Sequence, residues 1–269
     1  MSIANLEVSS FATGVELKAA LKKQNFELLL MDYHLGEGKN GVEWIHNLRE
    51  AGFIRPSTGI IFLTSDRSPQ IIGRIMDLQP DVLLIKPYTI ASLTRQINHY
   101  LTYRDFIKNA LHSLDNKQPD RAVNIIRAKI KEGIPPRLVG DIRKLYARLL
   151  VECGEISRAL SIYEDVLTRS EKVLWAQWGK IKCQYASGQW PDCKNHLGEL
   201  VNSSLARDKA FEWLASISFE QSAFEDVEKY LNEINFSELS LPAAKLKTIA
   251  FQKQDKVIEA IDLLQKKRA

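Results

Sequence analysis

The chain has 269 residues, a hydrophobic fraction of 45% and a formal net charge of +4. This length predicts two domains, each large enough for a packed core. Neither half is strongly basic and no apolar run is long enough to cross a bilayer, so we expect neither a nucleic-acid nor a membrane partner. The three cysteines lack zinc-site spacing and no signal peptide opens the chain, which favours a reduced, cytoplasmic protein.

The first half alternates short apolar runs with amphipathic stretches. The runs predict strands over residues 6–10, 26–31, 58–64 and 81–86. The stretches between and after them predict helices over residues 14–24, 40–52, 68–78 and 89–103. This βαβ rhythm is typical of a parallel sheet with helices on its faces.

Three of the predicted strands end in polar side chains. Asp32 ends the first of them, Thr64 ends the next, and Lys86 precedes a proline at the end of the third. Each residue alone would suit an ordinary structural role, as a helix cap or in a surface turn. Together they deliver a carboxylate, a hydroxyl and an ammonium to one edge of the sheet, a set that suits a phosphoryl group.

This pattern resembles the receiver domain of two-component response regulators over about residues 5–105. The resemblance implies that Asp32 accepts the phosphoryl group from a histidine kinase, Thr64 follows that group and Lys86 contacts it. It also implies that the His34 backbone carbonyl helps to hold Mg²⁺ together with Asp32, and that the Lys86–Pro87 bond is cis. Such a protein is a phosphoacceptor rather than an enzyme.

The chain departs from this family at several points, two of which bear on phosphotransfer and switching. Residues 6–10 align with the second strand of receivers, so the first strand, the first helix and the acidic pair that binds Mg²⁺ are absent. Leu83 stands where many receivers carry a switching Tyr or Phe. Loss of the acidic pair predicts impaired phosphotransfer. Either the chain is a fragment or the receiver is degenerate; retention of Asp32, Thr64 and Lys86 favours a fragment.

The second half contains an internal repeat. A turn residue, a large apolar residue, a small residue and a second large residue recur in that order. The small position falls at Ala159, Cys193, Val227 and Ala260, in steps of 34, 34 and 33 residues, with an earlier copy at Ala122. A helix–turn–helix period of 34 residues is typical of tetratricopeptide (TPR) repeats. The copies over residues 106–132 and 241–267 are weak, and the last could act as a cap.

Several residues of the second half have competing interpretations. In the TPR register Lys144 and Arg148 face a concave groove that binds a protein partner; otherwise they lie on a solvated helix face. Cys193 and His196 could hold a metal, but ordinary buried or surface roles are favoured. At the junction, the last receiver helix either runs almost directly into the next helix or ends in a loose joint over residues 103–105.

We therefore predict a doubly wound, flavodoxin-like α/β receiver over residues 1–104 that lacks its first strand and helix, followed by an all-α TPR solenoid over residues 105–269. This arrangement resembles VieB-like regulators. The leading interpretation is a response regulator phosphorylated at Asp32, with a protein-binding TPR output. The alternative is a phosphorylation-independent scaffold whose degenerate receiver only dimerises. Both leave a homodimer open.

Overall fold

A computed structural model describes residues 6–36 and 38–268. Contacts within the chain group it into two compact units, Met1–Ile162 and Tyr163–Ala269. The domain boundary predicted after residue 104 lies inside the first of these units, and the division falls within a helix of the second half.

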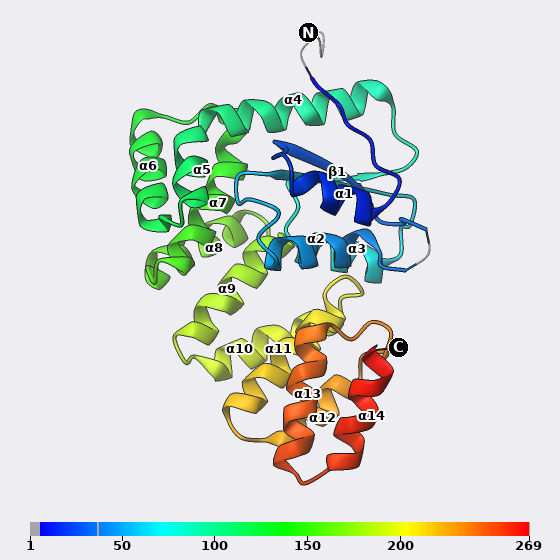
Figure 1. Cartoon of the computed structure of the whole chain (residues 1–269). Helices are drawn as coiled ribbons and strands as arrows, with labels where there is room; N and C mark the ends of the chain where they lie inside the picture. The colour runs from blue at the N-terminus through cyan, green and yellow to red at the C-terminus, as the bar shows by residue number, and fades with distance from the viewer. Residues whose placement is uncertain (1–5, 37, 269) are drawn as a thin grey trace. The chain divides into compact units, whose positions relative to one another are not determined.

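The first unit opens with a three-stranded parallel sheet. Its strands are β1 (Leu28–Asp32), β2 (Gly59–Thr64) and β3 (Val82–Ile85), hydrogen-bonded in the order β1-β2-β3. Helices α1 (Gly14–Leu21), α2 (Gly41–Glu50) and α3 (Pro69–Asp77) lie on one side of the sheet, and α4 (Ile90–Phe106) lies on the other (Figure 1). Seven of the eight elements predicted for this half are therefore confirmed, within a few residues at their ends.

The core of this α/β part is made by the apolar runs. Phe62 and Ile60 of β2 are fully buried, and they pack in one cluster with Leu29 of β1, Ile45 of α2 and Ile75 of α3. Helix α2 starts where the sequence encodes a start, because Asn40 and Glu43 form a reciprocal capping box. Because the three strands run parallel, their carboxyl ends lie at one edge of the sheet.

The strand predicted over residues 6–10 is wrong. These residues form no regular structure, and within the described part of the chain no backbone hydrogen bond involves them. Val8 is 82% exposed. The physical reason is that a strand needs a neighbour, and among the described residues β1 pairs with β2 alone. Residues 6–10 have the apolar pattern of a strand, but no described strand pairs with them.

The rest of the described chain is mostly helical, with turns between successive helices. The helices are α5 (Lys108–Asp115), α6 (Pro119–Glu132), α7 (Val139–Glu152, after a 3₁₀ turn at Pro136–Leu138), α8 (Ile156–Arg169), α9 (Leu174–Ala186), α10 (Trp190–Leu200), α11 (Arg207–Glu220), α12 (Phe224–Asn232), α13 (Leu241–Lys253) and α14 (Val257–Arg268). This is an all-α, TPR-like region. Ile107 alone separates α4 from α5, so the short junction is confirmed and the loose joint over residues 103–105 is wrong.

The 34-residue repeat is visible in the backbone and in the core. The second helix of each pair carries its small residue in a buried position; these are Ala122, Ala159, Cys193, Val227 and Ala260. Each turn before that helix holds one residue with positive φ; these are Lys117, Gly154, Gly188, Ser222 and Asp255. A left-handed residue ends a helix sharply, which lets the next helix fold back against it. Among the described helices, none combines the length and apolarity that a membrane span requires.

Candidate functional site

Asp32 and Lys86 meet at the carboxyl edge of the sheet. Asp32 is the last residue of β1, and Lys86 follows β3 directly. The Lys86 ammonium donates a hydrogen bond to Asp32 Oδ2, and both side chains remain about one-third exposed. This hydrogen bond raises the pKa of Lys86. The two side chains that the sequence predicted at one site are thus in direct contact, and solvent can reach them.

Local packing holds this edge in place. The Lys86 N–H donates to the Thr64 carbonyl across 2.7 Å, and the Lys86–Pro87 peptide bond is cis, as predicted. Gly41 begins α2 against the Asp32 carbonyl, and any side chain at this position would overlap that oxygen. The sequence therefore needs glycine here so that α2 can start beside the acceptor residue.

Thr64 lies at the end of β2, between the other two strands. Its side chain is fully buried, and Thr64 Oγ1 accepts a hydrogen bond of 3.0 Å from the Asp66 N–H. Asp66 in turn accepts a bond of 2.7 Å from the Ser68 N–H, and this bond lowers the pKa of Asp66. The hydroxyl is therefore engaged in the turn after β2, and among the described residues it makes no hydrogen bond to Asp32.

The described residues do not fit Mg²⁺ by themselves. The ion takes near-octahedral oxygen coordination, usually with one or two carboxylates. Asp32 supplies one carboxylate, and Lys86 already contacts it. The His34 N–H donates to Asp32 Oδ1 across 3.2 Å, which places this residue beside the carboxylate. No group of three His, Cys, Asp or Glu side chains suited to a metal occurs among the described residues.

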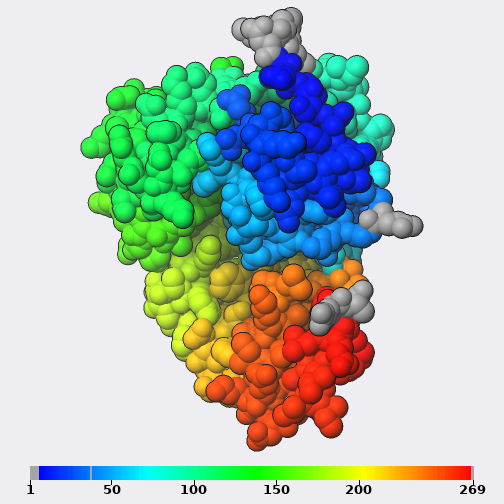
Figure 2. All heavy atoms as spheres, viewed as in Figure 1, coloured from blue at the N-terminus to red at the C-terminus, as the bar shows by residue number. Residues whose placement is uncertain are grey.

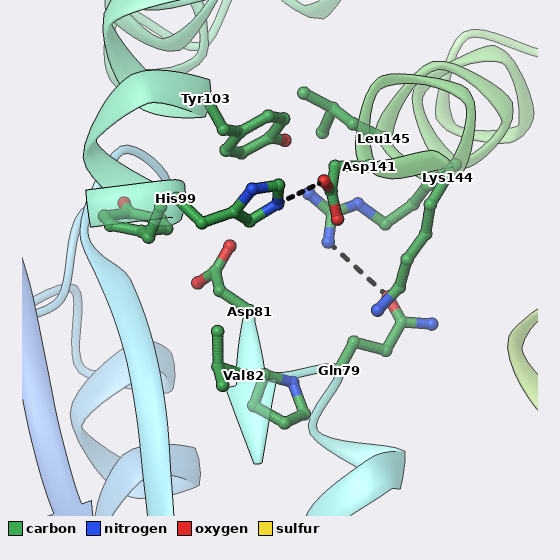
Figure 3. Close-up of a pocket in the computed structure, with 11 residues that line it drawn as sticks. Gln79, Asp81, Val82, His99, Tyr103, Asp141, Lys144 and Leu145 are labelled. Carbon is green, nitrogen blue, oxygen red and sulfur yellow. Dashed lines mark hydrogen bonds and ion pairs between the residues drawn. The ribbon is translucent and has the colours of Figure 1, made fainter. Parts of the chain in front are cut away.

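A second cluster of charged residues lies at the opposite end of β3. Asp81 precedes this strand, and its Oδ2 accepts a hydrogen bond of 2.8 Å from the Ile60 N–H. Figure 3 shows Asp81 in a small pocket of about 60 Å³, opposite the side chains of α4 and α7. Burial raises the pKa of Asp81. The hydrogen bond from the Ile60 N–H and the nearby charges of Lys144 and Arg148 oppose that rise.

The walls of this pocket connect the α/β part to α7. His99 of α4 and Asp141 of α7 form a hydrogen bond of 2.8 Å, drawn as a dashed line in Figure 3. Arg148 of α7 donates a long bond of 3.5 Å to the Gln79 side chain. Outside the pocket, on the loop before β2, the N–H and the hydroxyl of Ser57 donate hydrogen bonds of 3.0 and 2.7 Å to Asp115 of α5. The first unit is therefore joined by polar contacts as well as by helix packing.

Lys144 and Arg148 line this pocket. Burial lowers the pKa of the half-buried Lys144, and the Arg148 charge lowers it further. Both cations face residues of their own unit, which the TPR register did not anticipate; their role in partner binding stays a prediction. Sequence reasoning also missed Asp81, His99 and Asp141. Nothing in the sequence marks these three, because they are 18 to 60 positions apart and each has the sequence context of an ordinary surface or turn residue.

Cys193 and His196 do not form a metal pair. Cys193 is buried, and its Sγ contacts the Ile181 carbonyl at 3.4 Å. The His196 Nδ1 pairs instead with the Gln184 side chain at 3.1 Å. The ordinary packing role favoured for these residues agrees with this geometry.

Residues 1–98 match the family model described as the response regulator receiver domain. The three-stranded part of the chain is therefore a receiver domain. The comparison with curated proteins found no match. Solved structures with similarity include the MamA RS-1 ArsTM double mutant and MamA 41-end from Desulfovibrio magneticus RS-1, at 14% and 16% identity; each alignment covers 62% of this chain and 92% of that chain, with a TM-score of 0.44. A likeness this low carries no argument about function.

Proposed function

We propose that this protein is a response regulator that accepts a phosphoryl group at Asp32 and passes the signal to a protein-binding helical region. One observation carries the proposal: in a segment that matches the receiver family, the Asp32 carboxylate meets the Lys86 ammonium at the carboxyl edge of the sheet. An exposed carboxylate can act as a nucleophile, and an adjacent fixed cation can stabilise the charge that it gains.

The residues have distinct parts in this transfer. An Asp32 oxygen attacks the phosphorus of a phosphohistidine on the kinase, the P–N bond breaks, and an acyl phosphate forms on Asp32. Lys86 exchanges its carboxylate partner for a phosphoryl oxygen. Thr64 would donate to another phosphoryl oxygen; its hydroxyl accepts a bond from the Asp66 N–H, and a hydroxyl that accepts one bond can still donate its proton. Mg²⁺, where bound, would offset negative charge, but the described residues supply only part of its site.

A route from this site to the helices is present in the first unit. Residue 86 follows β3, and Asp81 precedes the same short strand. A shift of β3 caused by the exchange at Lys86 would therefore reach the pocket where Asp81 meets Lys144 and Arg148 of α7. Small displacements of this kind act by repacking an interface rather than by bending it. We infer that the helical region responds to phosphorylation through α7.

Phosphorylation of the purified chain by acetyl phosphate tests the proposal. We expect one added phosphoryl group by intact mass, sensitive to hydroxylamine as acyl phosphates are. The Asp32→Asn variant should lose the modification, whereas Asp105→Asn should keep it, because Asp105 lies on an exposed face of α4. Unmodified wild type under conditions that phosphorylate another receiver domain, or equal labelling of the Asp32→Asn variant, would contradict phosphate acceptance at Asp32.

The second candidate is a phosphorylation-independent scaffold in which the helical region binds its partner constitutively. Within the part of the chain that the structure describes, no group of three His, Cys, Asp or Glu side chains suits a metal ion, and this favours the scaffold. The two functions differ in one measurement, the affinity for the protein partner with and without beryllofluoride. A regulator predicts an affinity change that the Asp32→Asn variant lacks. A scaffold predicts the same affinity in all four samples.

A further inference from the structure

Two cations on one face of α7 are weakly partnered within the chain. Lys144 and Arg148 are one helical turn apart, a spacing at which like charges repel each other. Lys144 has no hydrogen bond or ion pair with a described residue. Arg148 donates a long bond of 3.5 Å to Gln79, and its Nε lies 3.9 Å from the Glu152 carboxylate, too far for a hydrogen bond. Both cations can therefore still donate hydrogen bonds to a ligand.

The pocket that these cations line has the size of a small ion. Its volume is about 60 Å³. Drug-sized ligands occupy roughly 300–1,000 Å³, whereas a water molecule needs about 10–15 Å³ of such space. The pocket therefore has room for a few groups of the size of water, which is the size of a tetrahedral oxyanion.

Positive charge is concentrated at this pocket. Burial lowers the pKa of Arg49 of α2, and the charge of Arg148 lowers it further. Arg148 acts on the pKa of Lys144 in the same direction. Three cations from two helices are thus close enough to repel one another. An anion placed among them would relieve that repulsion.

Carboxylates in the same pocket narrow the choice of anion. Figure 3 shows Asp81 across the pocket from Lys144, with Asp141 on the same helix as Lys144. Asp81 and Asp141 each use only Oδ2 in hydrogen bonds with described residues, to the Ile60 N–H and to His99. Each carboxylate can therefore accept one more proton donor.

This combination of charges distinguishes among oxyanions. Sulfate has no proton at neutral pH, so its oxygens would meet the carboxylates without a hydrogen bond. Inorganic phosphate keeps at least one proton at neutral pH. It can donate that proton to a carboxylate while its other oxygens accept hydrogen bonds from the cations.

We propose that this pocket is a binding site for inorganic phosphate, held by Lys144 and Arg148 and selected by Asp81. The Lys144 ammonium and the Arg148 guanidinium donate to the unprotonated oxygens, and the Asp81 carboxylate accepts the proton of the P–OH group. The bound ion would connect the turn before β3 with α7. The site lies at the opposite end of β3 from Lys86, so it is separate from Asp32 and does not depend on phosphorylation there.

NMR titration of the full chain with sodium phosphate tests the proposal. The readout is the Nε–H resonance of Arg148, assigned by its loss in the Arg148→Lys variant. We expect a saturable shift with phosphate, and binding weaker by about tenfold or more with sodium sulfate at the same ionic strength. Glycerol phosphate should also bind more weakly, because phosphomonoesters lose their last proton at a pKa of about 6.

Matched variants separate this site from unspecific attraction of anions. Lys144→Gln should weaken phosphate binding by about tenfold or more. Lys131→Gln makes the same change of charge at an exposed position and should leave binding unchanged; it lies on α6, which Figure 2 shows in green at the molecular surface.

Selectivity provides a readout that a folding defect does not imitate. Asp81→Asn keeps an oxygen for the Ile60 N–H, but it removes the charge that repels sulfate. The preference for phosphate over sulfate should therefore fall toward equality in this variant. An unshifted Arg148 resonance, equal wild-type affinities for the two ions, tighter binding of glycerol phosphate than of phosphate, equal effects of the two lysine variants, or an unchanged preference in Asp81→Asn would each overturn the proposal.

Discussion

Two glycines in one helical hairpin should respond oppositely to alanine. Gly179 of α9 is buried, and a methyl group there would come within 3.0 Å of three ring atoms of Tyr163. Gly198 of α10 has no such neighbour within 4 Å. Tyr163 is itself buried and packs edge-on against Trp175, so its ring has little room to move. The repeat thus uses a glycine where the tyrosine of the preceding helix crosses α9.

The magnitudes follow from opposing effects. Replacing a mid-helix glycine by alanine stabilises a helix by about 1 kcal/mol where space allows, which is the expected result for Gly198→Ala. At Gly179 the same gain meets overpacking, which costs roughly 1–3 kcal/mol. We therefore expect Gly179→Ala to be destabilising by up to about 2 kcal/mol, a fall of several degrees in melting temperature.

Urea unfolding followed by circular dichroism and by tryptophan fluorescence measures both changes. A double-mutant cycle identifies the cause: in a Tyr163→Leu background, Gly179→Ala should lose most of its cost, because the ring that it meets is gone. Two outcomes would refute this reasoning. Gly179→Ala could be as stabilising as Gly198→Ala, or its cost could persist unchanged without the tyrosine ring.

Three further predictions concern other parts of the chain. Asp32→Asn should lower the pKa of Lys86 toward its ordinary value, which NMR of the Lys86 side chain measures. Because folding raises this pKa in the wild type, the Asp32–Lys86 pair should contribute to the free energy of unfolding below the ordinary pKa of lysine. That contribution should be lost as the pH rises through the raised pKa. Burial raises the pKa of Cys183 and Cys193 to about 11, so iodoacetamide at pH 8 should modify them far more slowly in the folded chain than in urea, and equal rates would contradict the packing. Asp115→Ala removes two hydrogen bonds to Ser57 and should destabilise the first unit by about 2 kcal/mol in urea unfolding, whereas no change would mean that this contact contributes nothing.

The sequence determined the local elements and their order. Apolar runs identified β1, β2 and β3, and the capping residues at Asn40 and Thr89 fixed helix starts, because both signals depend on neighbours within a few positions. The 34-residue recurrence identified the helical hairpins, since each copy must bury the same position. The meeting of Asp32 with Lys86 followed from the rule that parallel strands end at one edge.

Only the tertiary structure decided features that depend on residues far apart in the chain. The apolar pattern of residues 6–10 encodes a strand, yet pairing decides whether it forms, and its neighbour is not among the described strands. The sequence left Lys144 either in a partner groove or on a solvated helix face, and only the packing shows that it lies near Asp81. The same packing brings His99 to Asp141. Periodicity reports which side of an element is buried, whereas the identity of what covers it comes from the fold.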